Sequence, residues 1–179
     1  MSHAPVRCVG VSSLFLDGLE GTESERHVVF CDLDSKRPIH EPGGFRTLVR
    51  RVMDQFDVGT FYAFETLKGV HLVSFSLYPR RLTERIEERF RSWGSDDTHQ
   101  NMSYRNGQAI MRVTPKPGEG QGPRYVAHFT RPTERPYSSP HFAFFRSKHG
   151  IPAPSGVPVG SVDGDVRLEA YDTYAVRMT

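Results

Sequence analysis

The stretch HVVFCDLD, residues 27–34, decides the fold, because a run of apolar β-forming residues ends here abruptly in charged side chains. A short, nearly continuous apolar run is typical of a strand that is buried on both faces in the middle of a sheet. We therefore predict a central strand over residues 27–33. The elements on its C-terminal side decide which sheet it belongs to.

Five further elements follow this strand, each indicated by its apolar periodicity or by a turn. An i, i+3, i+4 stripe predicts an amphipathic helix that carries Phe45, Leu48, Val49, Val52, Met53 and Phe56 on one face. Two strand-like runs joined at Gly69 predict a hairpin of residues 60–65 and 70–76. A second helix over 79–93 and a strand over 108–114 complete the series.

The order strand, helix, strand, strand, helix, strand is that of the split βαβ unit. We therefore predict an α+β protein with an RRM/ferredoxin-like βαββαβ core at about residues 27–114. In such a core right-handed crossovers place both helices on one face of an antiparallel sheet. The first and third strands are expected to be neighbours at the sheet centre.

The chain outside this core is predicted to belong to the same domain, residues 1–179. An extra N-terminal strand is expected over 6–16, and an irregular, β-rich extension over 115–179. The extension is rich in Pro, Gly and Ser. Its short runs at 125–129 and 141–145 are predicted as sheet segments with half-buried aromatic side chains. The runs at 166–170 and 173–178 are predicted to form a closing hairpin.

Composition restricts the classes of function without choosing among them. The net charge of +2 and the pI near 8.6 are mild for a nucleic-acid-binding protein. Arginine nevertheless clusters locally, at Arg46, Arg50, Arg51, Arg80, Arg81, Arg85, Arg89 and Arg91. Cys8 and Cys31 lack zinc-ligand spacing and are predicted to be buried thiols. No apolar stretch reaches the ~18–20 residues of a membrane span, and no leader pattern is seen, so we expect a cytoplasmic protein.

Asp32 and Asp34 are the first candidate site residues. Side chains at i and i+2 of an extended chain point to the same face, so the two carboxylates are expected to converge. Such a pair repels itself unless a cation neutralises it, and Mg²⁺ or Mn²⁺ prefers carboxylate oxygens. The alternative is an acidic turn that simply ends the strand.

Basic and acidic side chains on later elements could complete such a site. His71 opens the predicted third strand beside Lys68 and Gly69, where it could hold a phosphate or a nucleotide sugar, or be a purely structural histidine. Asp96 and Asp97 follow the second helix and could add a carboxylate. Downstream, Arg112 and Lys116 could supply cations for phosphate oxygens. No nucleophile-elbow, P-loop or dinucleotide fingerprint is present.

In their order along the chain, Asp32-Leu33-Asp34, Lys68-Gly69-Val70-His71 and then Asp97 with Arg112 resemble the three motifs of the archaeo-eukaryotic primase (AEP) superfamily, which includes the primase–polymerases. The family pattern is D-x-D or D-x-E after a hydrophobic strand, S-x-H opening a later strand, and a further acidic residue. Gly69 stands here in place of the serine. The catalytic part of that family has an RRM-like βαββαβ core.

The resemblance implies a nucleotidyltransferase that makes DNA or RNA on a template by two-metal chemistry, with Mg²⁺ or Mn²⁺ as cofactor. Asp32, Asp34 and Asp97 would bind the metal ions and His71 the phosphates of the incoming nucleotide. We extend the nucleotide-binding set to Lys68, Arg112 and Lys116. The third acidic ligand stays open, the alternatives to Asp97 being Asp96, Asp163, Asp165 and Asp172. Implied partners are nucleoside triphosphates, a single-stranded nucleic acid template, and a helicase or other replication protein.

Other classes of protein share this topology. A non-catalytic RRM-like nucleic-acid-binding protein would stack bases on exposed aromatics such as Phe61 or Phe75. A replication-initiator-like nickase would use metal-binding histidines on a central strand and a tyrosine nucleophile, for which His71 and Tyr104 are available. An inactive relative of the primases and a structural role are further alternatives, because a fold does not fix a function.

Overall fold

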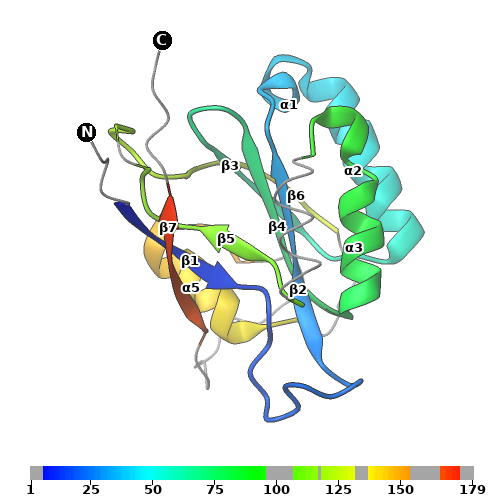
Figure 1. The fold of residues 1–179 in the computed structure, drawn as a ribbon. Coiled ribbons are helices and arrows are strands. Elements are labelled where there is room, and N and C mark those ends of the chain that lie inside the picture. Colours follow the sequence, from blue (N-terminus) through cyan, green and yellow to red (C-terminus); the bar gives the residue numbers. More distant parts are fainter. Residues whose placement is uncertain (1–5, 96–106, 117, 132–136, 154–165, 174–179) are drawn as a thin grey trace.

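The protein is an α+β structure with two antiparallel sheets, seen in a computed structural model that describes residues 6–95, 107–116, 118–131, 137–153 and 166–173 (Figure 1). The larger sheet has the order β2-β4-β3-β6, formed by Arg26–Leu33, Val70–Pro79, Phe61–Glu65 and Arg124–Phe129. The smaller sheet has the order β5-β1-β7, formed by Ile110–Arg112, Val6–Ser12 and Leu168–Thr173. In the described part of the chain, no helix has the length and apolar character that a membrane crossing requires.

Two helices cover one face of the larger sheet, as the periodicity predicted. They are α2 (Pro42–Phe56), preceded by the short α1 (Arg37–His40), and α3 (Arg80–Glu88), followed by the 3₁₀ turn η1 (Arg91–Trp93). The predicted stripe of α2 packs on alternate residues of β2, β3 and β4, and Ile86, Phe90 and Trp93 join the same core. Each large apolar side chain buried here contributes about 1.5–3 kcal/mol to folding.

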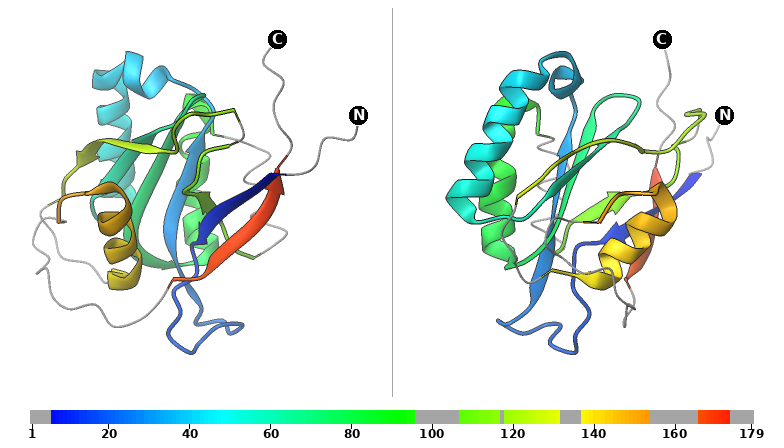
Figure 2. Two further views of the ribbon diagram at one scale, coloured as in Figure 1. Left: turned by 90° about the vertical axis from the view of Figure 1, so that its left-hand side faces the viewer. Right: turned by 180° about the vertical axis from the view of Figure 1, so that it is seen from behind.

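The opposite face of the larger sheet packs against the smaller sheet and the helix α5 (Ser139–His149) (Figure 2). Phe30, Phe64 and Phe75 of the larger sheet meet Phe145 of α5 in tilted ring contacts. Ser138 caps α5 by accepting a hydrogen bond from the backbone N–H of His141. β2 is thus buried on both faces, as predicted, and Cys8 and Cys31 are buried free thiols.

The predicted fourth core strand was placed wrongly. Residues 110–112 form β5, which pairs with β1 instead of β2, and the fourth strand of the larger sheet is β6, at the far edge beside β3. β2 therefore neighbours β4, as expected, but lies at a sheet edge. Other segments occupy that edge: Ser13 accepts a hydrogen bond from the N–H of Val28, and Ser95 bridges to Leu33.

The C-terminal extension is less β-rich than predicted. The aromatic run at 141–145 lies inside α5, so its side chains pack from a helix and not from a sheet. The predicted closing hairpin is also wrong, because β7 runs straight through the expected turn at residues 171–172 and pairs with β1. Residues 174–178 lie outside the described part of the chain.

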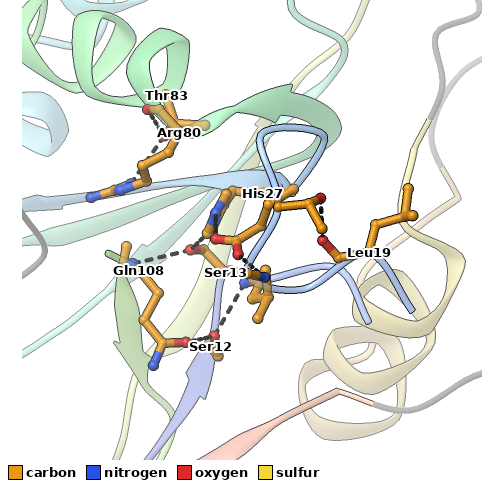
Figure 3. Close-up of polar contacts among 12 residues, drawn as sticks. Ser12, Ser13, Leu19, His27, Arg80, Thr83 and Gln108 are labelled. Atoms are coloured by element: carbon orange, nitrogen blue, oxygen red, sulfur yellow. Dashed lines mark hydrogen bonds and ion pairs between the residues drawn. The ribbon is translucent and has the colours of Figure 1, made fainter. Parts of the chain in front are cut away.

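A buried polar seam joins the two sheets where β1 ends (Figure 3). The hydroxyl of Ser13 accepts from the N–H of Ala109 and lies 2.9 Å from Nδ1 of His27, and Nε2 of that histidine lies 2.7 Å from a carboxylate oxygen of Glu25. The hydroxyl of Ser12 bonds the side-chain oxygen of Gln108. The buried side chains of Ser12, Ser13 and His27 thus have hydrogen-bond partners, which offset the cost of burying them.

His141 connects these buried polar contacts to α5 through its hydrogen bonds. Because a carbonyl oxygen only accepts, Nε2–H of His141 donates to the carbonyl of Ser12 (2.7 Å), and Nδ1 faces the Ser138 hydroxyl at 2.5 Å. Burial lowers the pKa of His141 from 6.5 to about 4. The folded protein therefore holds the imidazole of His141 in its neutral form at neutral pH.

We expect the protein to lose stability in mild acid through this histidine. The pKa of His141 is 6.5 in the unfolded chain and about 4 in the folded chain. The contribution of the neutral ring to the free energy of unfolding is therefore fully present above pH 6.5. It is lost as the pH falls from 6.5 to about 4, a loss of about 3 kcal/mol. Urea unfolding at a series of pH values measures this. His141→Gln should be less stable at pH 7 and should show a flatter profile over this window; an unchanged slope would contradict the assignment.

Candidate functional site

The pairing of β2 with β4 places Asp32 directly opposite His71. On the next strands Phe64 lies opposite His71, and Tyr125 opposite Phe64, so four side chains form a row across the sheet. Because side chains alternate along a strand, Asp32 shares a face with Phe30 and not with the helix-facing Leu33. The row therefore lies on the face opposite α2 and α3.

Asp32 and His71 form a close pair that is open to solvent on one side. Nε2 of His71 lies 3.5 Å from Oδ1 of Asp32, and the side chains are 4% and 27% exposed, respectively. The buried imidazole of His71 thus contacts a carboxylate that solvent and solutes can reach. These two residues, which the sequence predicted to lie on neighbouring strands, are the predicted site residues that the described structure brings together.

Of the other acidic residues predicted for the site, only part lies in the described ranges. Asp34 is exposed, one residue past the end of β2, and its N–H donates to the carbonyl of Gly94 (2.7 Å). Asp96 and Asp97 lie outside the described residues, as do Asp163, Asp165 and Tyr104. Asp97 is two residues along the chain from Ser95, which bridges to Leu33 between the two aspartates.

Asp172 belongs to a different part of the structure. It lies on β7, where it pairs with β1 in the smaller sheet. Within the described ranges, no group of three or more His, Cys, Asp or Glu side chains could hold a metal ion. A divalent ion at Asp32 and Asp34 would therefore need ligands beyond the described residues, or water.

The hairpin before His71 packs tightly on the segment after β2. A Cβ on Gly69 would lie 1.8 Å from the carbonyl oxygen of Leu33 and 2.9 Å from the backbone nitrogen of Ser35. This contact explains why glycine stands at position 69. Lys68, the residue before it, is exposed at the tip of the turn.

A charged cluster that the sequence did not reveal lies beside the same hairpin. Lys36 donates to Glu65 (2.8 Å) and to the carbonyl of Thr66, and Arg124 binds the other oxygen of Glu65 at 2.7 Å. The hydrogen bonds from Lys36 and Arg124 lower the pKa of Glu65. With the glycine-rich residues 118–122 these side chains line a hollow of about 320 Å³. The GEGQG run was the only sequence signal for it.

Arg112 is the last residue of β5, and Lys116 lies in the loop that follows it. The guanidinium of Arg112 is buried and binds Glu119 (2.9 Å) and the carbonyl of Thr114 (2.7 Å), and the backbone N–H of Lys116 donates to Glu119. Burial raises the pKa of Glu119, but the Lys116 N–H and Arg112 outweigh it, so the pKa is lowered overall. Arg112 is thus engaged by a carboxylate of its own chain, and its role towards a phosphate stays a prediction.

No protein-family model, curated protein or solved structure matches this chain.

The close approach at Gly69 makes a direct prediction about stability. Gly69→Ser should destabilise the protein by about 2–3 kcal/mol, because backbone atoms of Leu33 and Ser35 would have to move. A fall in Tm of several degrees is expected in thermal unfolding. Gly120→Ser is the matched control, since a Cβ there meets open space. Equal melting temperatures for both variants would contradict the packing described here.

Proposed function

We propose that the Asp32–His71 pair belongs to the active site of a nucleotidyltransferase of the primase–polymerase type, which makes DNA or RNA on a template. The observation that carries the proposal is the 3.5 Å approach of an accessible carboxylate to a buried imidazole, on paired strands of one sheet. The strand order β2-β4-β3 with two helices on one face supports an RRM-like core. The D-x-D and x-H motifs then occupy adjacent strands.

The residues present suit a hard divalent ion in part. Asp32 and Asp34, at the end of β2, would supply carboxylate oxygens, which are the ligands that a hard divalent ion prefers. Bound Mg²⁺ or Mn²⁺ would activate the attacking hydroxyl and stabilise the charge of the leaving pyrophosphate. Asp96 or Asp97 is the natural third ligand in sequence, since the chain leaves Ser95 beside Leu33.

The protein's own side chains would position the substrate. In this proposal Asp32 and Asp34 anchor the triphosphate through the cation, and the buried His71 orients the Asp32 carboxylate through its Nε2 contact, in place of the direct phosphate contact expected from sequence. Lys68, at the exposed hairpin tip, would reach the same phosphates. Catalysis would then consist mainly of alignment and charge neutralisation.

The binding-protein alternative loses its proposed base-stacking residues. Phe61 and Phe75 are buried in the two cores, so neither ring is available to stack on a base. The exposed rings that this alternative requires are therefore not provided by Phe61 or Phe75. The nickase alternative needs a second histidine beside His71, and in the described residues no cluster of three metal ligands forms there.

Metal-dependent incorporation of labelled nucleotide on primed and unprimed single-stranded templates tests the proposal. Asp32→Asn/Asp34→Asn should lower the rate at least ~100-fold, because charge stabilisation in the transition state is lost. Asp17→Asn/Asp54→Asn is the matched control, since both positions are exposed and distant in sequence from the motif. Circular dichroism should show that both double variants stay folded.

Two outcomes would contradict the proposal. One is a well-folded wild-type protein that incorporates no nucleotide with Mg²⁺ or Mn²⁺ on either template. The other is an equal rate for wild type and the Asp32→Asn/Asp34→Asn variant.

A further inference from the structure

The outer surface of α2, α3 and η1 carries a concentration of positive charge. Seven arginines are exposed there, namely Arg46, Arg50, Arg51, Arg81, Arg85, Arg89 and Arg91. Only two acidic side chains of these segments are exposed, Asp54 and Glu88, which leaves an excess of five positive charges. We call this the arginine surface.

The rest of the chain has the opposite sign. Residues 42–56 and 80–93 contain eight arginines and four acidic residues, a net charge of +4, whereas the whole chain carries +2. The other residues together are therefore net negative. The mild overall charge hides a polarised molecule, and local fields of this kind decide which charged partners bind and where.

The arginine surface is continuous across both helices. The guanidiniums of Arg85 on α3 and of Arg89, the residue that caps its C-terminus, lie over the ring of Phe56 on α2, at 5.8 and 5.7 Å. Figures 1 and 2 show the two helices side by side on the same layer. Along α3 and its C-cap, Arg81, Arg85 and Arg89 recur every fourth residue, so they form a row with a rise of about 6 Å per step.

The chemistry of this surface favours a phosphate backbone over exposed bases. Arginine presents a planar fork of donors that fits phosphate oxygens in a bidentate manner. The nearby rings of Phe56, Trp93 and Phe129 are buried, and guanidiniums of Arg85, Arg37 and Arg46 lie over them. Single-stranded binding uses exposed aromatic rings for stacking, and the arginine surface offers none among these three.

We propose that the arginine surface binds the phosphate backbone of double-stranded nucleic acid, without sequence preference. Charge complementarity carries this inference: a duplex presents a dense, regular row of negative charge, and the surface presents rows of arginine on two adjacent helices. Since α2 and α3 cover the face opposite Asp32 and His71, a duplex bound there leaves that site free. The inference does not depend on the chemistry proposed for Asp32.

Fluorescence anisotropy with a labelled duplex of about 20 base pairs, made once of DNA and once of RNA, tests this surface. Arg50→Gln/Arg81→Gln/Arg85→Gln keeps the side-chain stems but removes three charges. Its affinity for whichever duplex wild type binds more tightly should fall at least tenfold. The slope of log K against log salt concentration should become shallower by about 2–3. Arg26→Gln/Arg146→Gln/Lys148→Gln removes the same charge from exposed positions elsewhere and should bind within twofold of wild type.

Three results would overturn the proposal. The first is no binding of either duplex by wild type at ~50 mM salt, where phosphate contacts are strong. The second is equal weakening by both triple variants, which would reflect net charge alone. The third concerns binding to phosphatidylserine vesicles, measured for the same proteins. If Arg50→Gln/Arg81→Gln/Arg85→Gln weakens binding to the vesicles but not to either duplex, the surface would be assigned to an anionic membrane. Asp32→Asn/Asp34→Asn should bind the duplex like wild type, so this test is separate from that of the active site.

Discussion

The register between β2 and β4 is the constraint on which the rest of the structure depends. Both strands are buried on both faces, with Val29, Cys31 and Leu33 towards the helices and Phe30 towards α5. A slip by one residue would exchange the two faces, placing the carboxylate of Asp32 in the helix-facing core and an apolar side chain beside His71. Burying an unpaired charge in that core would cost several kcal/mol. The apolar packing on both sides therefore determines that Asp32 and His71 meet.

The two faces of this sheet then acquire different properties. One is sealed by α2 and α3, whose outward sides carry the arginine surface. The other is covered by β5 and α5 over most of its length, and the buried Ser13–His27 and Ser12–His141 contacts fix where that cover lies. Asp32 retains access to solvent at the end of β2, next to the hairpin that packs through Gly69. Proposed chemistry and proposed duplex binding are thus on opposite sides of one layer.

Local pattern was enough to predict the elements around β2, because the stripe of α2 and the apolar runs of β2, β3 and β4 are properties of neighbouring residues. It also placed Asp32 and His71 on neighbouring strands, because the split βαβ order makes the first and third strands neighbours. The choice of edge for residues 110–112 depends on Ser13 occupying the edge of β2, which no local pattern reveals. α5 was missed because its run of three phenylalanines within four residues fits a strand as well as a helix. The Lys36–Glu65–Arg124 cluster joins positions 29 and 59 residues apart, and Asp96 and Asp97, proposed above as the third acidic ligand, lie outside the described residues.

Paramagnetic broadening by Mn²⁺ in ¹H–¹⁵N spectra is the most direct measurement of the central claim, that Asp32, Asp34 and His71 form a cation-dependent site, because it reports position without requiring turnover. At substoichiometric Mn²⁺ we expect the amide signals of Leu33, Asp34 and His71 to disappear first, and to persist in Asp32→Asn/Asp34→Asn. Broadening centred instead on the Glu65 cluster, or identical broadening in wild type and variant, would contradict the account.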